Sequence, residues 1–219
     1  MKTDAKKPGI LYLSVFLFLT CAAAAAVMAV AAKMTEKPIL ERQQNRIAEA
    51  LVQVLPPFDT VEQKEVQSKD GVPASLFTVR KDGRIAGYAV QTSTQKGYGG
   101  TILALTGFDP DGSIHRIVVI QHAETPGIGT KVVSREKIRT VSSLFRTEPP
   151  EPAGSVPANE ALDSYNGKNA ALFVPAEGGA SAPRPDVHFV TGATISSLAV
   201  LDLETRASEI LKNNVPEVR

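Results

Sequence analysis

The longest apolar stretch lies near the N-terminus. Residues 10–32 contain no charged side chain. A helix of that length reaches ~34 Å at about 1.5 Å per residue, enough to cross the ~30 Å hydrocarbon core of a membrane. A cleaved signal peptide is the alternative, because the alanines offer A-x-A sites, but the run exceeds the usual apolar region of ~7–15 residues. The pattern favours an uncleaved transmembrane helix over residues 10–32.

Basic residues flank this run in nearly equal numbers. The positive-inside rule therefore decides little by itself. Because the run follows the free N-terminus and no second span is apparent, we expect residues 1–9 in the cytoplasm. The remainder would then lie on the periplasmic side of a bacterial inner membrane.

Apolar residues recur at helical spacing after Pro38, up to the Pro56-Pro57 pair. The stripe consists of Leu40, Ile47, Leu51 and Leu55. Such a stripe is typical of an amphipathic helix that covers another surface. We expect residues 33–73 to form a helical linker between the anchor and a globular domain over residues 74–213, with a tail at 214–219.

From residue 74 the pattern changes to strand segments separated by turn residues. Segments 74–81 and 84–94 flank Asp82-Gly83, which is a hairpin signature. Segments 101–109 and 113–122 follow a glycine-rich turn and Pro110-Asp111-Gly112. Strands joined by tight turns predict an antiparallel meander, not the alternating strands and helices of a doubly wound sheet. With packed helices, the expected class is α+β.

Helical spacing returns after these strands. Residues 131–145 place apolar side chains on one side and predict a helix. Residues 147–185 hold seven of the fifteen prolines and read as an excursion rich in proline, alanine and glycine. Within it, residues 148–152 are expected to be extended and exposed, and residues 175–183 to form a flexible surface segment. A last helix is expected to begin around Thr194 and to end near Asn213-Asn214, before Pro216.

Composition argues against several classes of function: nucleic-acid binding, metal binding and independent catalysis. The net charge of +1, without a basic stripe, gives no support for nucleic-acid binding. The single Cys21 excludes an internal disulfide and a cysteine-built metal site. His115, His122 and His188 lack a ligand spacing, so no metal site is expected. No nucleophile–base pair or carboxylate pair stands out, so we expect no independent catalytic site.

Two stretches carry candidate chemistry. Val190–Ser197 reads V-T-G-A-T-I-S-S and places Thr194 where helix-start N–H groups and the positive dipole end suit a phosphate. On local chemistry alone, Thr191 or Thr194 would only cap the helix, worth ~1 kcal/mol. The second stretch, Glu124–Lys131, reads E-T-P-G-I-G-T-K, a constrained loop whose backbone can approach a ligand closely. Alone, it would be a turn.

Four motifs occur in a fixed order after the single apolar span: G-Y-G-G-x-I, D-P-D-G, H-x-E-T-P-G-I-G-x-K and T-G-A-T-I-S-S. This order resembles the G subunit of the Rnf electron-transport complex, within the FMN-binding domain family. The related C subunit of the sodium-translocating NADH:quinone oxidoreductase is the alternative, and the shorter chain favours Rnf. The resemblance covers the span and roughly residues 70–212.

The resemblance implies a cofactor. In that family a threonine of the [S/T]-G-A-[T/S] motif carries FMN through a phosphoester bond installed by a flavin transferase, so the implied acceptor is Thr194. Gly192 and Ala193 would leave room for the transferase and the phosphate. Helix-start N–H groups would offset the phosphate charge. Further contacts to the phosphate end are expected from Thr191, Ser196 and Ser197.

In the family the second loop lies around the flavin. The residues expected beside the isoalloxazine are therefore Glu124, Thr125, Gly127 and Gly129, with Tyr98 and Lys131 as weaker candidates. One position departs from the pattern. The family usually has an acidic residue six positions before the acceptor, where this chain has His188, with Asp186 two residues earlier. The transferase reads this region, so the change bears on the efficiency of modification.

The resemblance also implies a role and partners. The chain would be a redox subunit of a larger membrane complex that links ferredoxin and NAD oxidoreduction to ion transport, with the flavin carrying the electron chemistry. Its partners would be the other subunits and, during maturation, the flavin transferase. The alternative is a non-redox anchored module that binds a partner or ligand, or a flavin-bearing sensor domain.

Overall fold

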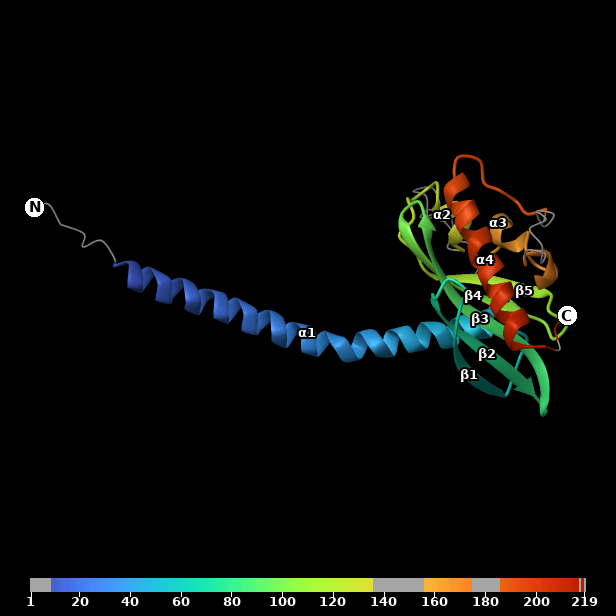
Figure 1. The fold of residues 1–219 in the computed structure, drawn as a ribbon, viewed down its shortest axis with the longest axis horizontal. Coiled ribbons are helices and arrows are strands. Elements are labelled where there is room, and N and C mark those ends of the chain that lie inside the picture. Colours follow the sequence, from blue (N-terminus) through green and yellow to red (C-terminus); the bar gives the residue numbers. More distant parts are fainter. Residues whose placement is uncertain (1–8, 136–155, 175–185, 217, 219) are drawn as a thin grey trace, which may run out of the picture. The chain divides into compact units, whose positions relative to one another are not determined.

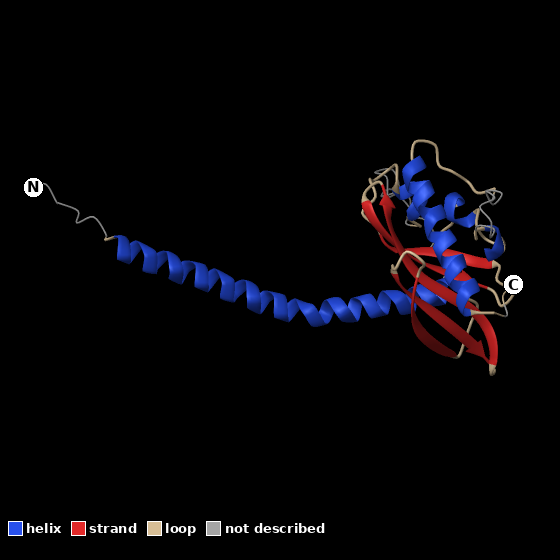
Figure 2. Cartoon of the chain, viewed as in Figure 1, coloured by secondary structure: helices blue, strands red, loops and turns tan. Residues whose placement is uncertain are grey.

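The computed structural model describes residues 9–135, 156–174, 186–216 and 218. Contacts divide the chain into two compact units, Met1–Arg46 and Ile47–Arg219. The first is helical, whereas the second combines a sheet with helices (Figure 2). We describe each unit by itself.

Helix α1 runs without interruption over Ile10–Val54. Its part from Ile10 to Glu36 is long and apolar enough to cross a membrane, and in the described part of the chain it is the one helix that meets this test. The sequence predicted separate helices before and after Pro38. Instead the helix continues through this proline, which removes one backbone N–H donor but does not end the helix.

The second unit is built on a five-stranded sheet whose order follows the chain, β1-β2-β3-β4-β5, with every pair antiparallel (Figure 1). The strands are β1 Thr60–Gln67, β2 Pro73–Lys81, β3 Arg84–Gly97, β4 Gly100–Phe108 and β5 Ile114–Gln121. Asp82 and Gly83 both have positive φ, 51° and 76°, as the predicted tight hairpin between β2 and β3 requires. The predicted antiparallel meander and the α+β class are confirmed.

The sequence interpretation missed β1, which lies inside the stretch that we expected to be a helical linker. Its residues T-V-E-Q-K-E-V-Q are mostly polar, and seven of the eight are exposed. An edge strand of this kind buries little apolar surface and carries charges that discourage pairing with another chain. Its hydrophobic pattern is correspondingly weak, although its pairing with β2 extends from Thr60 to Gln67.

Helix α4, Thr194–Asn214, lies across one face of the sheet (Figure 1). Its end at Asn214 agrees with the predicted end, and Pro216 follows two residues later. The core beneath it joins α4 to strands of the sheet and to the segment 161–173. Its fully buried members include Val90, Ile102, Phe108, Ile117, Leu162, Leu203 and Leu211. This core supports the helix that begins at Thr194.

The last turns of α1, within the second unit, cover the other face of the sheet. Their core cluster comprises Ala50, Leu51, Val54, Leu55, Phe77, Val79, Ala89 and Leu105. A Cβ atom on Gly107 would overlap the carbonyl of Val54, so the helix end can approach β4 only because this residue is glycine. Arg116 donates from Nη1 to the carbonyl of Gln53 at 3.0 Å, which satisfies one acceptor at the helix end.

Two further predictions need correction. The helix predicted over 131–145 is a single turn, α2 Thr130–Val133, because Ser134 is extended (φ −97°, ψ 135°); residues 136–145 lie outside the described residues. The excursion predicted over 147–185 contains α3 Glu160–Asp163 and η2 Ala170–Leu172, whereas its segments 148–152 and 175–183 lie outside the described residues. Tyr165 and Phe173 stack there at 5.7 Å between ring centroids and belong to the core.

Candidate functional site

The T-G-A-T motif forms a tight turn directly before α4. The N–H of Ala193 donates to the carbonyl of Val190 at 3.0 Å, and Gly192, at the third position of the turn, has φ 84°. A positive φ at this position is typical of a type II turn and favours glycine. Thr191 and Gly192 are exposed, whereas Ala193 is buried. The turn therefore anchors on Ala193 and leaves the threonines on the surface.

Thr194 is the first residue of α4, and it is exposed. The N-cap position belongs to Ala193, which has no side chain that can cap the helix. The alternative in which Thr191 or Thr194 is an N-cap threonine is therefore wrong. The first N–H groups of a helix lack carbonyl partners within it and lie at the positive dipole end. Thr194 thus presents its side chain at an end that attracts anions.

The two serines that follow are buried, and their hydroxyl groups bond within the chain. Ser196 donates from Oγ to Glu124 Oε2 at 2.8 Å. Ser197 donates to the carbonyl of Ala193 at 3.1 Å and accepts from the N–H of Val190 at 3.3 Å. The sequence suggested both hydroxyls as donors to a phosphate. In this geometry they instead hold the turn and the loop against the helix.

Glu124 is the residue that joins the two predicted motifs. Its carboxylate is buried and accepts from Ser196 on α4 and from the N–H of Gly99, in the β3–β4 turn, at 3.3 Å. Gly129 lies against it, because a Cβ atom there would overlap the Glu124 side chain and approach Ser196 Oγ to 3.1 Å. The structure therefore brings Glu124, Gly129 and Ser196 together, from segments about seventy residues apart.

The rest of the E-T-P-G-I-G loop is exposed and closed by its own hydrogen bonds. The carbonyl of Thr125 accepts from the N–H of Thr130 at 3.2 Å, and the N–H of Gly127 donates to Thr130 Oγ1 at 2.8 Å. Thr125, Gly127 and Lys131 are all exposed. The N–H of Glu124 donates to His122 Nδ1 at 3.3 Å, at the end of β5. These hydrogen bonds close the loop at one edge of the site.

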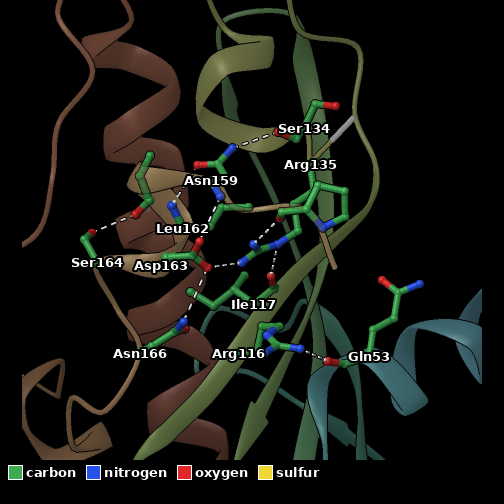
Figure 3. A network of polar contacts seen from close by, with 12 residues as sticks. Gln53, Arg116, Ile117, Ser134, Arg135, Asn159, Leu162, Asp163, Ser164 and Asn166 are labelled. Carbon is green, nitrogen blue, oxygen red and sulfur yellow. Dashed lines mark hydrogen bonds and ion pairs between the residues drawn. The ribbon is translucent and has the colours of Figure 1, made fainter. Parts of the chain in front are cut away.

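A polar network holds α2, and thus the end of this loop, against α3 (Figure 3). Arg135 donates to the carbonyls of Ile117 at 3.1 Å and Pro157 at 2.9 Å and to Asp163 Oδ1 at 2.7 Å. Asn159 donates from Nδ2 to the carbonyl of Ser134 at 2.8 Å. Burial alone would raise the pKa of Asp163, but the hydrogen bonds and charge of Arg135 hold it below its usual value.

Sequence reasoning missed these network residues. The available signal was Asn159, a typical N-cap residue, whose Oδ1 accepts from the N–H of Leu162 at 3.0 Å. It was overlooked because it lies in a stretch rich in proline and alanine. The role of Arg135 carries no local signature, because its partners come from β5, residue 157 and α3.

Polar contacts also position α4 along the sheet. Asp202 accepts hydrogen bonds from Thr94 Oγ1 at 2.8 Å and from Lys96 Nζ at 2.6 Å. Burial alone would raise the pKa of Asp202, but these hydrogen bonds and the nearby positive charges hold it below its usual value. Glu204 is fully buried and accepts from Thr106 Oγ1 at 2.8 Å. Burial raises the pKa of Glu204 to about 8, with the Thr106 hydrogen bond acting in the opposite direction.

The departure at His188 falls on an exposed side chain before the turn. Its N–H donates to Ser164 Oγ at 2.9 Å, and its Nε2 lies 4.0 Å from Glu160 Oε2. Asp186 is exposed as well. Both residues therefore lie on the surface before the turn.

Comparison with known proteins places this geometry in a family. A family model described as an FMN-binding domain matches residues 97–209, more than half of the chain and a range that includes both the loop and the T-G-A-T motif. The chain belongs to the FMN-binding domain family. The matched range begins at Gly97, the last residue of β3, and ends within α4.

Two of the relatives match this chain over about nine tenths of their length, and a third matches over a shorter part. The G subunit of the Na(+)-translocating ferredoxin:NAD(+) oxidoreductase complex of Acetobacterium woodii is 28% identical over 92% of this chain and 91% of that protein. The G subunit of the ion-translocating oxidoreductase complex of Erwinia tasmaniensis is 28% identical over 94% of this chain and 89% of that protein. The corresponding Haemophilus influenzae protein is 43% identical over 27% of this chain and 29% of its own length. The resemblance found in the sequence is confirmed.

The residues around Thr194 fit the phosphate end of FMN. The FMN-binding domain offers an exposed hydroxyl, the first-turn N–H groups and the positive end of a 21-residue helix. The carboxylate that joins the two motifs, Glu124, is buried and already bonded to Ser196 and Gly99. Because the Glu124 carboxylate is buried and bonded to Ser196 and Gly99, it is not exposed on the surface where Thr194 lies. That surface can therefore accept a negatively charged group.

Proposed function

We propose that this protein is a membrane-anchored electron-transfer subunit that carries FMN as a phosphoester on Thr194 and works in an ion-translocating oxidoreductase complex. FMN supplies the electron-transfer chemistry once it is attached. The chain supplies the attachment point, an environment for the phosphate and a fixed place for the flavin. It has no need of a catalytic acid, base or nucleophile of its own for this task.

The observation that carries the proposal is the position of Thr194. It is exposed at the first residue of α4, while Ala193 occupies the N-cap position. A threonine at the N-cap position accepts a hydrogen bond from a backbone N–H with its side-chain oxygen. Thr194 lies one residue after that position, so its hydroxyl does not cap the helix. The turn before it contains only Gly192 and Ala193 between the two threonines, so the chain that leads into Thr194 carries little side-chain bulk.

The phosphate charge is favoured by the backbone. N–H groups and the dipole at a helix start stabilise an anion, and the effect is strongest within the first turn. Ser196 and Ser197 act indirectly in this proposal, because their hydrogen bonds fix the loop and the turn on which the site depends. The side of the site toward the β3–β4 turn and the 124–131 loop is formed by Glu124, Thr125, Gly127, Gly129, Tyr98 and Lys131.

The anchor and the partners are parts of the same proposal. The Ile10–Glu36 segment is long and apolar enough to cross a membrane, and the relatives are named as components of ion-translocating oxidoreductase complexes. We propose a single span, with residues 1–9 cytoplasmic and the FMN-binding domain periplasmic. The other subunits would exchange electrons with the flavin, and a flavin transferase would attach it.

Mass spectrometry after co-expression with a flavin transferase tests the attachment. The wild-type chain should yield a tryptic peptide containing Thr194 with the added mass of FMN less one water. Thr194→Ala should abolish this mass and the in-gel flavin fluorescence of the denatured protein. Thr191→Ala is the matched control, because it removes another exposed threonine of the same motif, and it should keep both signals.

Two results would overturn the covalent assignment. One is a wild-type chain that carries no added mass while a known substrate of the same transferase is modified in parallel. The other is a Thr194→Ala variant that keeps its fluorescence while Thr191→Ala loses it, which would move the attachment to the earlier threonine. A complex that transfers electrons normally with Thr194→Ala would instead support a non-redox role for this chain.

A further inference from the structure

One carboxyl group under α4 is buried without a positive partner. Glu204 has no exposed surface, and its one hydrogen bond is the 2.8 Å contact from Thr106 of β4. Its second oxygen, Oε2, is also buried and has no hydrogen-bond partner within the described residues. No lysine, arginine or histidine of that part of the chain forms an ion pair with Glu204. A carboxylate has about four acceptor sites, so one donor is far from replacing its water.

The surroundings of Glu204 contain hydroxyl groups but no cation. Ser208 follows one helical turn later, is fully buried, and its Oγ has no hydrogen-bond partner among the residues that the structure describes. Tyr165 is buried as well, and its pKa is raised first by burial and then by the charge of Glu204, so the two groups interact. Such surroundings accommodate a neutral acid, whereas a negative charge there is not compensated.

The charged groups on the neighbouring elements do not change this picture. Helix α4 packs against β3, β4, α2 and η2, and neither β4 nor η2 carries a titratable side chain. The ion pairs of α4 are Asp202 with Lys96 and Arg206, Arg206 with Asp70, and Glu209 with Lys69. The other titratable groups are three exposed cations and one buried tyrosine: Arg84, Lys131, Lys212 and Tyr88. No cation on these elements therefore offsets the charge of an ionised Glu204.

The two halves of α4 are held on the domain by different polar contacts. In the first half, Ser196 bonds Glu124, and Asp202 accepts from two residues of β3. From Glu204 onward, the hydrogen bond with Thr106 is the one buried polar contact between the helix and the sheet in the described residues. The remaining contacts each involve an exposed side chain of β1 or of the turn after it: Lys64 with Asn214, Lys69 with Glu209, and Asp70 with Arg206. The second half therefore depends on apolar packing and on Glu204.

We propose that the carboxyl group of Glu204 is a pH-sensitive latch for the second half of α4: the neutral acid lets residues 204–214 pack on the sheet, and the ionised form favours their separation from it. A charge in a dry interior is costly, so ionisation shifts the equilibrium toward an opened helix in which water surrounds the carboxylate. Burial keeps the neutral form up to a pKa of about 8, so the latch opens at alkaline pH. The inference concerns only the packing of α4 and does not depend on the attachment proposed at Thr194.

Hydrogen exchange of the full chain in detergent, followed by mass spectrometry, tests the latch. Protection factors, corrected for the intrinsic exchange rate, are compared for peptides covering residues 204–214 of α4 and residues 73–81 of β2. In the wild-type chain the α4 peptides should be at least about tenfold less protected than the β2 peptides, because the helix opens without global unfolding. Their protection should also fall at least about tenfold from pH 6 to pH 8, because the opened state releases the Glu204 proton that the closed state keeps.

Three variants show whether Glu204 is responsible. Glu204→Gln keeps the oxygen that accepts from Thr106 but cannot ionise, so its α4 peptides should show no fall between pH 6 and pH 8. Glu209→Gln is the matched control on the same helix, and it should keep the fall. Thr106→Val removes the hydrogen bond that lowers the pKa of Glu204, so the fall should continue to a higher pH. This last variant tests the latch even if Glu204→Gln does not fold.

Three results would contradict the latch. A fall of the wild-type size in Glu204→Gln means that another group controls the helix. A fall that ends at the same pH in Thr106→Val and in the wild-type chain means the same. Equal protection of residues 204–214 and 73–81 in the wild-type chain means that the helix separates only when the whole domain unfolds. None of these results affects the attachment proposed at Thr194, which is measured by the mass of its tryptic peptide.

Discussion

The two faces of the sheet are covered by helices in different ways. On one face the end of α1 packs through a cluster of apolar side chains that includes Val54, Leu55 and Leu105. On the other face α4 also covers an apolar core, but hydrogen bonds cross the interface, from Thr94 to Asp202 and from Thr106 to Glu204. On the α1 face Arg116 bonds a backbone carbonyl, that of Gln53, whereas on the face that carries the candidate site side chains of α4 bond side chains of the strands.

This difference shows what each kind of contact contributes. Apolar burial is non-directional, so it holds a helix against a sheet but tolerates small shifts. Hydrogen bonds depend on distance and angle, so they set the rotation and register of α4 on β3 and β4. Because Thr194 is the first residue of α4, this register decides where the hydroxyl of Thr194, the proposed acceptor, lies. Contacts on the α1 face need only hold the helix against the sheet, whereas contacts on the α4 face must also fix the position of Thr194.

The largest expected effect on stability comes from truncating a buried leucine in either core. Leu105→Ala on the α1 face and Leu203→Ala on the α4 face remove fully buried side chains, and each should lower the free energy of unfolding by about 3 kcal/mol. Urea unfolding of the two variants measures this loss. Only Leu203→Ala should also change the visible absorption or iodide quenching of the bound flavin. A change of the same size in Leu105→Ala would contradict the division of roles between the faces.

A smaller effect is expected from the buried carboxyl under α4. The folded chain keeps a proton on Glu204 up to a pKa of about 8, while the unfolded chain releases it near 4.5. The folded state therefore binds more protons in this window, and Glu204 makes the free energy of unfolding fall as pH rises, by about 1 kcal/mol per pH unit. Its contribution is complete below the unfolded pKa and is lost as pH rises through the folded pKa.

Glu204→Gln should remove this slope, measured by urea unfolding between about pH 5 and pH 8. The control is Glu209→Gln on the same helix, and it should retain the slope, because the Glu209 carboxylate pairs with Lys69 at 3.3 Å near the surface.

Tyr165 is a second group whose pKa is raised, by its own burial and, to a smaller extent, by the charge of Glu204. An unchanged slope in Glu204→Gln would mean that another group is responsible for the pH dependence.

The smallest expected effect concerns the polar contact at the end of α1. Arg116→Ala removes the hydrogen bond to the carbonyl of Gln53 and should lower the free energy of unfolding by about 1 kcal/mol. Arg84→Ala, on an exposed arginine at the start of β3, should change it by less than about 0.5 kcal/mol. Flavin attachment should persist in both variants. Loss of attachment in Arg116→Ala would show that the α1 face also positions the site.

Much of the fold could be predicted because its signals are local. The strands from residue 73 onward have apolar runs separated by glycine, proline and aspartate, and the turn residues fix their antiparallel order. β1 was missed because an exposed edge strand has no apolar pattern. The helix predicted over 131–145 ended at Val133, where Ser134 turns extended and the Arg135 network begins. Tertiary contacts overrode helical spacing there.

The candidate site likewise has parts that could be predicted from the sequence and parts that could not. The T-G-A-T motif and the 124–131 loop were recognisable from their residues and their order, and the family comparison confirmed the resemblance. Their contact through Glu124 and Ser196 could not be predicted, because a hydrogen bond between residues 72 positions apart has no local signature. The same holds for Arg135, whose three partners come from separate segments of the chain.

By itself, the sequence determined the apolar helix, the order of the meander, the turn before α4 and the threonine that begins it, since all depend on residues close together in the chain. Only the tertiary structure decided that Ala193 holds the N-cap position, that both serine hydroxyls are used internally, and that Glu124 fastens the loop to α4. These features depend on long-range packing, which sets where side chains end and which hydrogen bonds they can make.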